Sequence, residues 1–311
     1  MRALDAVATW PAHAAAGAVV AAAAGSPAAG PGKGCALAGT YGDVDRTFPW
    51  ASVTKLCTAL AVLVAVEEGT VALDDAAGPP GATVAHLLSH ASGLAPQGRR
   101  AITGPGRRRI YSNAGFELLG ELVAARSGMA FASYLREAVL EPLGVGSRLV
   151  AGGSPASGMH GTLADLLALG AELLRPTVVA PETLAVATTV AFPDLPGVLP
   201  GFGRQVPCDW GLGFEIRDGK EPHWTGRRND PGTFGHFGQS GAFLWVDPEA
   251  GVACGSLADR DFGPWAAAAW PALSDAVLGE LAFPAADAVP GGPPTRPPGS
   301  REDGWYDRPS I

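Results

Sequence analysis

Apolar residues are grouped so that they predict strands near both ends of the chain and helices between them. Short apolar runs bounded by glycine or proline are typical of strands. Such runs occupy residues 17–24, 35–39, 211–217, 241–247 and 251–257. The last two meet at an Asp-Pro-Glu-Ala-Gly sequence, which is typical of a hairpin turn. Because the runs come from both ends of the chain, we expect one antiparallel sheet assembled from the two termini.

Helical patterns dominate the middle of the chain. The helix expected over residues 54–68 is apolar on nearly all sides, so it should be buried, and Gly69 ends it. Further helices are expected over residues 83–89, 114–127, 131–140, 163–175, from Pro181 onward, and over 262–283 with a kink at Pro271. The expected fold class is α+β: an antiparallel sheet flanked by terminal helices, with an all-helical inserted region.

This order of elements divides the chain into three parts. Residues 1–50 and 205–283 should form a discontinuous α/β sheet region, and residues 51–204 a helical region. The final part, residues 284–311, carries seven prolines in 28 positions, so we expect it to be disordered.

Composition and charge narrow the function classes. Hydrophobic residues make up 47% of the 311 residues and charged residues 17%, the balance of a soluble globular protein. A net charge of −8 argues against nucleic-acid binding, and no apolar run is long enough to suggest a membrane span. The apolar segment 14–24 imitates a signal peptide, but Asp5 and Trp10 precede it. We therefore expect a buried strand there and a cytoplasmic protein.

Cysteine and histidine spacing gives no support for a metal site. The four cysteines form no C-x-x-C pair and are expected to be buried free thiols; they are Cys35, Cys57, Cys208 and Cys254. His86 and His90 lie four apart, but the pair lacks the glutamate of a zinc-protease helix. We expect structural histidines, no metal and no cofactor.

The sequence Ser52-Val53-Thr54-Lys55 brings a hydroxyl and an amine to the same face of a helical turn. A serine hydroxyl is a weak nucleophile and needs a base beside it, and a lysine shielded from water can lose its proton and act as that base. Taken alone, the same spacing also fits a helix N-cap followed by a surface lysine.

Two further segments carry groups suited to acyl transfer. Tyr111 could relay a proton to a leaving group, and Asn113 could bind a substrate amide or the lysine, although Ser112 or Asn113 could equally cap the next helix. In His-Phe-Gly-Gln-Ser-Gly, at the start of an expected strand, Gly238 would let the substrate approach closely. Residues 236, 238 and 240 should share one face of that strand, with His236 directed to the cleft.

The ordered set Ser52-x-x-Lys55, Tyr111-x-Asn113 and His236-x-Gly238 resembles the three motifs of the serine β-lactamase and penicillin-binding protein superfamily. The tyrosine motif is similar to that of class C β-lactamases, D-alanyl-D-alanine carboxypeptidases and related esterases. The segments HLLSHASGL, YSNAGFELLG and GLGF resemble the same group, and the likeness extends over residues 15–282.

The resemblance implies a role for each matched residue. Ser52 would be acylated, while Lys55 and Tyr111 would share general-base and general-acid work. Asn113 would hold the substrate, and the backbone N–H groups of Ser52 and Gln239 would form the oxyanion hole. The resemblance also implies a site in the cleft between the sheet and the helical region. The partner implied is a small-molecule acyl substrate; the oligomeric state stays open.

The third motif departs from the pattern of penicillin-recognising enzymes. His236 stands where these enzymes usually carry a lysine that binds the substrate carboxylate, and an unperturbed histidine is mostly neutral at pH 7. This favours an esterase acting on small acyl esters or amides. A β-lactamase or D-amino-acid peptidase, and a non-catalytic ligand-binding member of the fold, are the alternatives.

A basic loop precedes Tyr111. It contains Arg99, Arg100, Arg107, Arg108 and Arg109. The loop is either solvated or supplies, at the cleft entrance, the anion contact that His236 lacks.

Overall fold

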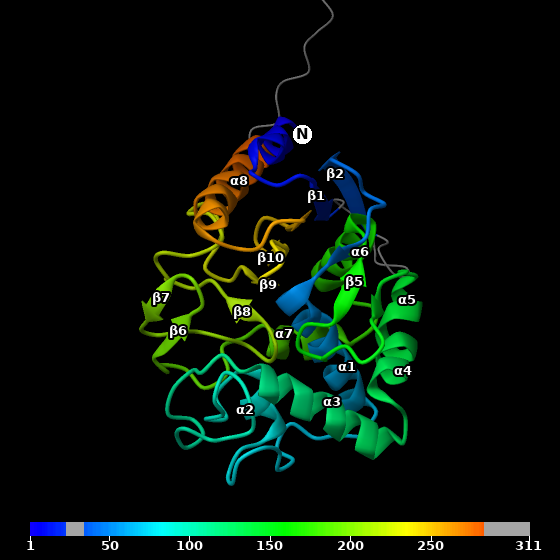
Figure 1. Cartoon of the computed structure of the whole chain (residues 1–311), viewed down its shortest axis with the longest axis vertical. Coiled ribbons are helices and arrows are strands. Elements are labelled where there is room, and N and C mark those ends of the chain that lie inside the picture. Colours follow the sequence, from blue (N-terminus) through cyan, green and yellow to red (C-terminus); the bar gives the residue numbers. More distant parts are fainter. Residues whose placement is uncertain (23–33, 283–311) are drawn as a thin grey trace, which may run out of the picture.

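The computed structural model describes residues 1–22 and 34–282 (Figure 1). The expected disordered tail over residues 284–311 lies outside the described residues.

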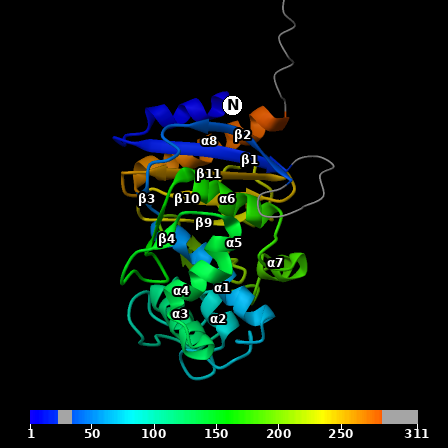
Figure 2. The ribbon, with the colours of Figure 1, turned by 90° about the vertical axis from the view of Figure 1, so that its right-hand side faces the viewer.

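A six-stranded antiparallel sheet combines strands from both ends of the chain, as the sequence predicts. The strands follow the order β2-β1-β11-β10-β9-β8 (Figure 2). They are β1 (Ala15–Ala22), β2 (Cys35–Tyr41), β8 (Glu215–Ile216), β9 (Phe234–Phe237), β10 (Phe243–Asp247) and β11 (Val252–Ala258). The segment that imitates a signal peptide is largely β1, which pairs with β11 on one side and β2 on the other.

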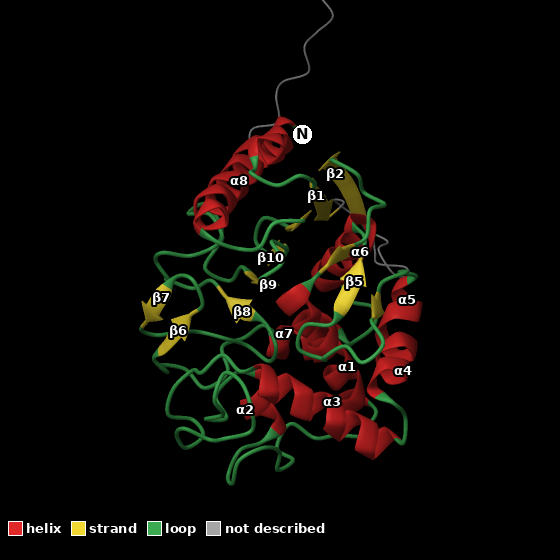
Figure 3. Ribbon diagram, viewed as in Figure 1, coloured by secondary structure: helices red, strands yellow, loops and turns green. Residues whose placement is uncertain are grey.

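Helices cover both faces of this sheet (Figure 3). Helix α6 (Leu163–Leu174) packs on one face, whereas α8 (Pro264–Ala282) and the 3-10 helix η1 (Arg2–Thr9) cover the other. Along β1, Ala18 joins the core on the α6 side and Val19 the core on the α8 side. A strand buried on both faces needs apolar residues at every position, which is why its sequence shows a continuous apolar run.

The helical region surrounds α1 (Thr54–Glu67), which is buried over most of its length and ends before Gly69, a residue at φ +72°. The other helices are α2 (Val84–Leu88), α3 (Asn113–Ser127), α4 (Phe131–Leu135), the π-helical turn η3 (Arg136–Leu140), α5 (Glu141–Leu143) and α7 (Pro181–Ala187). Thr83 and Thr162 cap α2 and α6, because each hydroxyl accepts a hydrogen bond from a backbone N–H in the first turn.

Short strands make the region over 51–204 mostly helical rather than all-helical. Strand β3 (Phe48–Pro49) pairs with β5 (Met159–Gly161), which pairs with β4 (Arg148–Leu149); β6 (Gly197–Leu199) pairs with β7 (Gly203–Gln205). Strands this short carry no measurable apolar alternation. The chain also continues helically past Pro142, since proline fits the first turn of α5, where no N–H donor is required.

Two expected strands have different limits in the structure, and one helix was not expected. Only Glu215–Ile216 forms a strand within residues 211–217, because Gly213 adopts φ +98° and interrupts the extended chain. The strand expected at 241 begins at Phe243, and a separate strand, β9, precedes it. Sequence analysis did not predict η1, a 3-10 helix whose buried residues are Leu4 and Val7.

The cysteines are free thiols, three of them buried and Cys35 half-buried. Of the helices within residues 1–22 and 34–282, none has the length and apolar character needed to span a bilayer.

The basic loop contains one arginine that is part of the core. Arg109 is buried and donates hydrogen bonds to the carbonyl groups of Ser89, Cys208, Ala191 and Phe192. It thereby ties three distant segments together and is not available to bind a substrate anion. The hypothesis of an anion contact by this loop is therefore wrong for Arg109.

Replacing Arg109 by methionine is expected to lower the free energy of unfolding by about 2–4 kcal/mol, because several buried carbonyl groups lose their donor. The neighbouring Arg108 is exposed, and Arg108→Met should change stability by no more than about 0.5 kcal/mol. Urea unfolding of both variants measures the difference; equal midpoints would contradict the bracing role.

Candidate active site

Ser52 lies in a short 3-10 turn, η2 (Ala51–Val53), immediately before α1. The residue before it, Ala51, has φ +44°, a left-handed conformation that is costly for a residue with a Cβ atom. Backbone strain of this kind persists only where surrounding contacts impose it, and it is concentrated at functional sites. Here Trp50 is held by its N–H bond to the Met159 carbonyl at 2.9 Å.

Lys55 is fully buried and has three oxygen neighbours. Its Nζ lies 2.8 Å from Asn113 Oδ1, 2.9 Å from the Ala156 carbonyl oxygen and 3.3 Å from Ser52 Oγ. The first two can only accept hydrogen bonds, whereas the serine hydroxyl can also donate. A neutral amine would donate to the first two and direct its lone pair at Ser52.

The surroundings of Lys55 favour this neutral form. Burial lowers the pKa of Lys55 well below its usual range, and the nearby Glu117 carboxylate opposes that shift. Glu117 follows Asn113 by four residues, so both lie on the same face of α3. Its carboxylate accepts a hydrogen bond from Ser154 Oγ at 3.1 Å, and Ser154 Oγ accepts one from the Ala156 N–H at 3.1 Å.

Replacing Glu117 by glutamine is expected to lower the pKa of Lys55 further, because a carboxylate stabilises the charged ammonium. Lys55 should then stay neutral to a lower pH than in the unmodified protein. NMR of protein labelled with carbon-13 at the lysine ε-carbon can measure this, since the chain has only three lysines, Lys33, Lys55 and Lys220.

A matched control for this titration is Glu121→Gln, one helical turn further along α3. The Glu121 side chain is exposed and paired with Arg99, so its loss should leave the Lys55 titration almost unchanged. If both variants shifted the pKa of Lys55 equally, general surface charge rather than the Glu117 contact would control that pKa.

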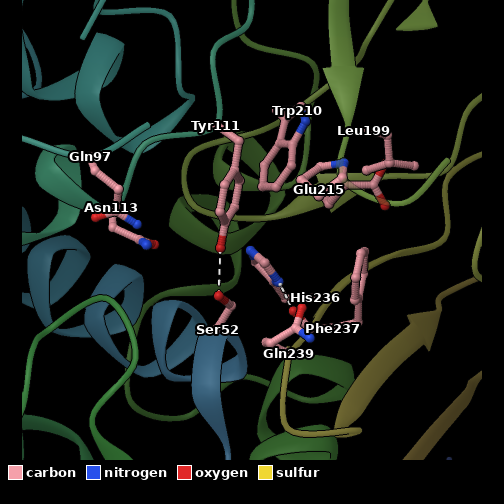
Figure 4. A pocket seen from close by; sticks show the side chains of 11 residues that line it. Ser52, Gln97, Tyr111, Asn113, Leu199, Trp210, Glu215, His236, Phe237 and Gln239 are labelled. Atoms are coloured by element: carbon pink, nitrogen blue, oxygen red, sulfur yellow. Dashed lines mark hydrogen bonds between the residues drawn. The ribbon is translucent and has the colours of Figure 1, made fainter. Parts of the chain in front are cut away.

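Tyr111 completes a group of three functional side chains around one oxygen atom. Its hydroxyl donates a hydrogen bond to Ser52 Oγ at 2.6 Å (Figure 4). Burial raises the pKa of Tyr111, although the hydrogen bond with Ser52 opposes the shift. The phenol is therefore neutral at physiological pH and can act as a proton donor.

His90, which sequence analysis treated as scaffold, supports the Tyr111 ring from behind. It is a buried residue at φ +56°, with its ring centroid 4.7 Å from those of Tyr111 and Trp210. Its Nδ1 accepts a hydrogen bond from the Ser112 N–H at 3.1 Å, and burial lowers its pKa well below the usual range. His90 is thus a neutral ring that fixes the position of the phenol.

The segment Tyr111–Asn113 serves the site and the helix at once. Ser112 caps α3, its hydroxyl accepting a hydrogen bond from the Gly115 N–H, so the predicted capping role is confirmed for this residue. Asn113 begins the helix, and its side-chain oxygen accepts a hydrogen bond from Lys55. The motif therefore both caps the helix, through Ser112, and contacts the lysine, through Asn113.

The expected strand arrangement around His236 is wrong. His236 lies near the end of β9, and residues 238–242 form the tight turn to β10, in which the Gly238 N–H donates to the Ala242 carbonyl at 2.7 Å. Residues 236, 238 and 240 therefore share no strand face, and the Ser240 hydroxyl instead bonds the Pro49 carbonyl. The glycine signals of a hairpin were present in the sequence but were assigned to a strand entry.

Gly238 is required for contact between the turn and the start of α1. A Cβ atom there would lie 2.4 Å from the Trp50 carbonyl oxygen and 3.2 Å from the Ser52 nitrogen. The close neighbour of Gly238 is therefore protein backbone rather than the substrate that we expected. This contact places Gln239, the next residue, beside the segment that contains Ser52.

The site opens into a pocket of about 310 Å³ between the sheet and the helical region. Figure 4 shows Tyr111 pointing toward Ser52, with His236 beside them and Asn113 and Gln97 on the opposite side. The lining residues are Ser52, Gln97, Tyr111, Asn113, Leu199, Pro200, Trp210, Glu215, His236, Phe237 and Gln239. The pocket thus brings together Ser52, Tyr111, Asn113, His236 and Gln239, with Lys55 buried behind it and Gly238 in the adjoining turn.

His236 carries no positive charge at neutral pH in this environment. Burial, reinforced by Lys55, lowers the pKa of His236 to about 3. Its Nδ1 lies 2.7 Å from the Phe237 carbonyl, an acceptor, so Nδ1 carries the proton and Nε2 has a free lone pair. Nε2 is buried and has no protein partner among the described residues. The neutral ring therefore cannot form an ion pair with a ligand.

Sequence analysis missed a buried charged cluster at the far side of the pocket. Glu215 contacts Lys220, His223 and Trp224 through its two carboxylate oxygens. Burial favours the protonated acid, but His223 and Lys220 hold the pKa of Glu215 at about 2. The cluster thus places a compensated anion, and no free cation, at the pocket wall. No sequence motif predicts this cluster, because the loop after β8 brings Lys220, His223 and Trp224 back to Glu215.

Comparisons with known proteins find a family whose model matches most of this chain. The family model described as Beta-lactamase matches residues 12–147 and 145–278. Penicillin-binding protein 4* of Bacillus subtilis (strain 168) is 27% identical over 131 residues; the match covers 32% of this chain and 29% of that protein. The match thus spans less than a third of that relative's length.

Solved structures give a more extensive match. A crystal structure of a beta-lactamase from Mycobacterium bovis has a TM-score of 0.84 and 53% identity, covering 90% of this chain and 99% of that chain. A mutant of simvastatin synthase from Aspergillus terreus has a TM-score of 0.70 at 17% identity, covering 90% of this chain and 95% of that chain. The second likeness concerns the fold alone.

Proposed function

Since the chain belongs to the beta-lactamase family, we propose that it is a serine hydrolase that forms an acyl-enzyme on Ser52 and acts on small, uncharged acyl esters or amides. One observation carries this proposal: the Lys55 amine and the Tyr111 hydroxyl both lie within hydrogen-bonding reach of Ser52 Oγ, at 3.3 Å and 2.6 Å. A nucleophile with a base and an acid at these distances has the geometry that acyl transfer needs.

Acylation begins when the neutral Lys55 amine takes the Ser52 hydroxyl proton and Oγ bonds to the substrate carbonyl carbon. The carbonyl electron pair moves onto its oxygen, which we assign to the backbone N–H groups of Ser52 and Gln239. The bond to the leaving oxygen or nitrogen then breaks. The leaving atom takes the Tyr111 hydroxyl proton, and the proton held by Lys55 restores the phenol.

Deacylation uses the same groups with water in place of the alcohol or amine. Water bonds to the acyl carbon and gives one proton to the Lys55 and Tyr111 pair. The bond to Ser52 Oγ breaks, the serine regains that proton, and a carboxylic acid leaves. The starting protonation states are restored, so the cycle closes without a cofactor.

The charges around the pocket support uncharged substrates. The ionisable residues that line it are Tyr111, Glu215 and His236; the phenol and the imidazole are neutral, and Glu215 is an anion. A substrate carboxylate would therefore meet two neutral groups and an anion that Lys220 already compensates, and none of the lining residues is a free cation. An ester or amide without a carboxylate avoids this cost.

Hydrolysis of β-lactams or D-amino-acid peptides is the second candidate. It is favoured by the 53% identity to the Mycobacterium bovis structure, which is described as a beta-lactamase. Both candidates use the same acyl-enzyme chemistry and differ only in how the substrate is held. The neutral His236 makes an anionic lactam the poorer ligand.

The two candidates can be separated by comparing kcat/KM for p-nitrophenyl acetate with that for nitrocefin. We expect faster turnover of the acetate, together with labelling by a fluorophosphonate probe. A higher kcat/KM for nitrocefin would replace the esterase proposal by the second candidate. If neither substrate is turned over and no probe reacts, the third alternative, a non-catalytic binding protein, is left.

A further inference from the structure

A second hollow of about 390 Å³ adjoins the catalytic pocket on its outer side. Its wall is mainly apolar, built from Pro96, Ile102, Ile110, Val198 and Pro200, and Arg108 and Arg109 also line it. We call it the outer groove. Two of its residues are large hydrophobic side chains left open to solvent, Ile102 at 54% and Val198 at 52% exposed.

The outer groove and the catalytic pocket share three chain segments. In each segment one residue lines the pocket and its neighbour lines the groove: Gln97 and Pro96, Tyr111 and Ile110, Leu199 and Val198. Tyr111 and Pro200 line both hollows. The groove therefore lies directly beside the catalytic pocket, with Tyr111 and Pro200 at their common edge.

The position of the outer groove beside Tyr111 indicates which half of a substrate would reach the groove. In the proposed mechanism the Tyr111 hydroxyl protonates the leaving atom, so that atom must lie next to this hydroxyl. The oxyanion donors lie elsewhere, at Ser52 and Gln239 beside the Gly238 turn. A leaving group that extends away from its oxygen past Tyr111 enters the outer groove.

We propose that the outer groove binds the leaving group of the substrate, and that this group is an apolar alcohol, so that the substrates are esters of apolar alcohols. This rests on the proposed function and specifies its substrate class. Covering Ile102 and Val198 with an alkyl chain removes exposed apolar surface from water, which provides the driving force.

The test is a series of acetate esters of alcohols of increasing length, from methyl to butyl to hexyl, followed by pH-stat titration. In the unmodified protein kcat/KM should rise with the length of the alcohol. Val198→Ser and Ile102→Ser should each lower kcat/KM for hexyl acetate by about fivefold to tenfold, with little effect on methyl acetate.

The matched control is Val206→Ser. Val206 is also a highly exposed valine, 64% accessible, and it lines neither hollow. Val206→Ser should leave kcat/KM unchanged for every ester in the series. Thermal melting checks that all variants are folded. An equal loss in the Val206 variant, or no dependence on alcohol length, would overturn the proposal.

A second series assigns the groove to one half of the substrate. Methyl esters of increasingly long acids vary the acyl group and keep the leaving group small. If Val198→Ser affects this series instead, the groove binds the acyl chain and the proposal is wrong. Failure of the proposed function looks different: even p-nitrophenyl acetate would not be turned over by the unmodified protein.

Discussion

Replacing Ser52 by alanine is expected to lower kcat/KM for p-nitrophenyl acetate by about 10⁴-fold or more, to the background given by the remaining groups. Without Oγ no acyl-enzyme can form, and neither Lys55 nor Tyr111 can substitute for it as the attacking atom. The substitution removes one oxygen from a residue at a helix start, so the fold should be retained. Initial rates at several substrate concentrations measure the loss.

The chain offers a matched control for this prediction in Ser240. This serine lies in the turn next to Gln239, and its hydroxyl donates to the Pro49 carbonyl rather than facing Lys55. Ser240→Ala should retain activity within about tenfold, the cost of one hydrogen bond near the site. Comparable losses in both variants, or a Ser52 variant that stays active, would contradict the assignment of the nucleophile.

Replacing Lys55 by methionine is expected to slow acylation by about 10³-fold, because the base that receives the Ser52 proton is lost. Methionine has a similar length and an apolar end, so it can occupy the fully buried site of Lys55. Single-turnover measurements with p-nitrophenyl acetate isolate the acylation step.

Lys55→Arg distinguishes a base from a fixed positive charge. A guanidinium can donate to Asn113 and Ala156 but stays protonated, so it cannot receive a proton. We therefore expect the arginine variant to be about as slow as the methionine variant. Recovery of activity in Lys55→Arg would mean that charge, and not proton transfer, is what Lys55 contributes.

The sequence was sufficient for the parts of the site that depend on local spacing. Ser52 and Lys55 are three residues apart at a helix start, and Tyr111 precedes a helix whose cap, Ser112, is recognisable from its sequence. The strand pattern likewise predicted a sheet assembled from both termini, because β1 and β11 are buried on both faces and carry continuous apolar runs.

Features that arise from tertiary contacts were not predictable in this way. Arg109 resembles its exposed neighbours Arg107 and Arg108 in sequence, and only packing makes it a buried brace. Glu215 and Trp210 line the pocket through a loop and a short strand without any motif spacing. His236 was expected at the start of a strand but lies near the end of β9, because the glycine-rich turn after it was interpreted as the beginning of a strand.

The central claim is that Ser52 carries the acyl group during turnover. Incubating the protein with a slowly released ester, quenching it with acid, and locating the added mass by peptide mapping tests this directly. We predict one acyl group per chain, attached to the peptide that contains Ser52 and absent from Ser52→Ala. An acyl group on another residue, or ester turnover without any covalent adduct at Ser52, would contradict the account.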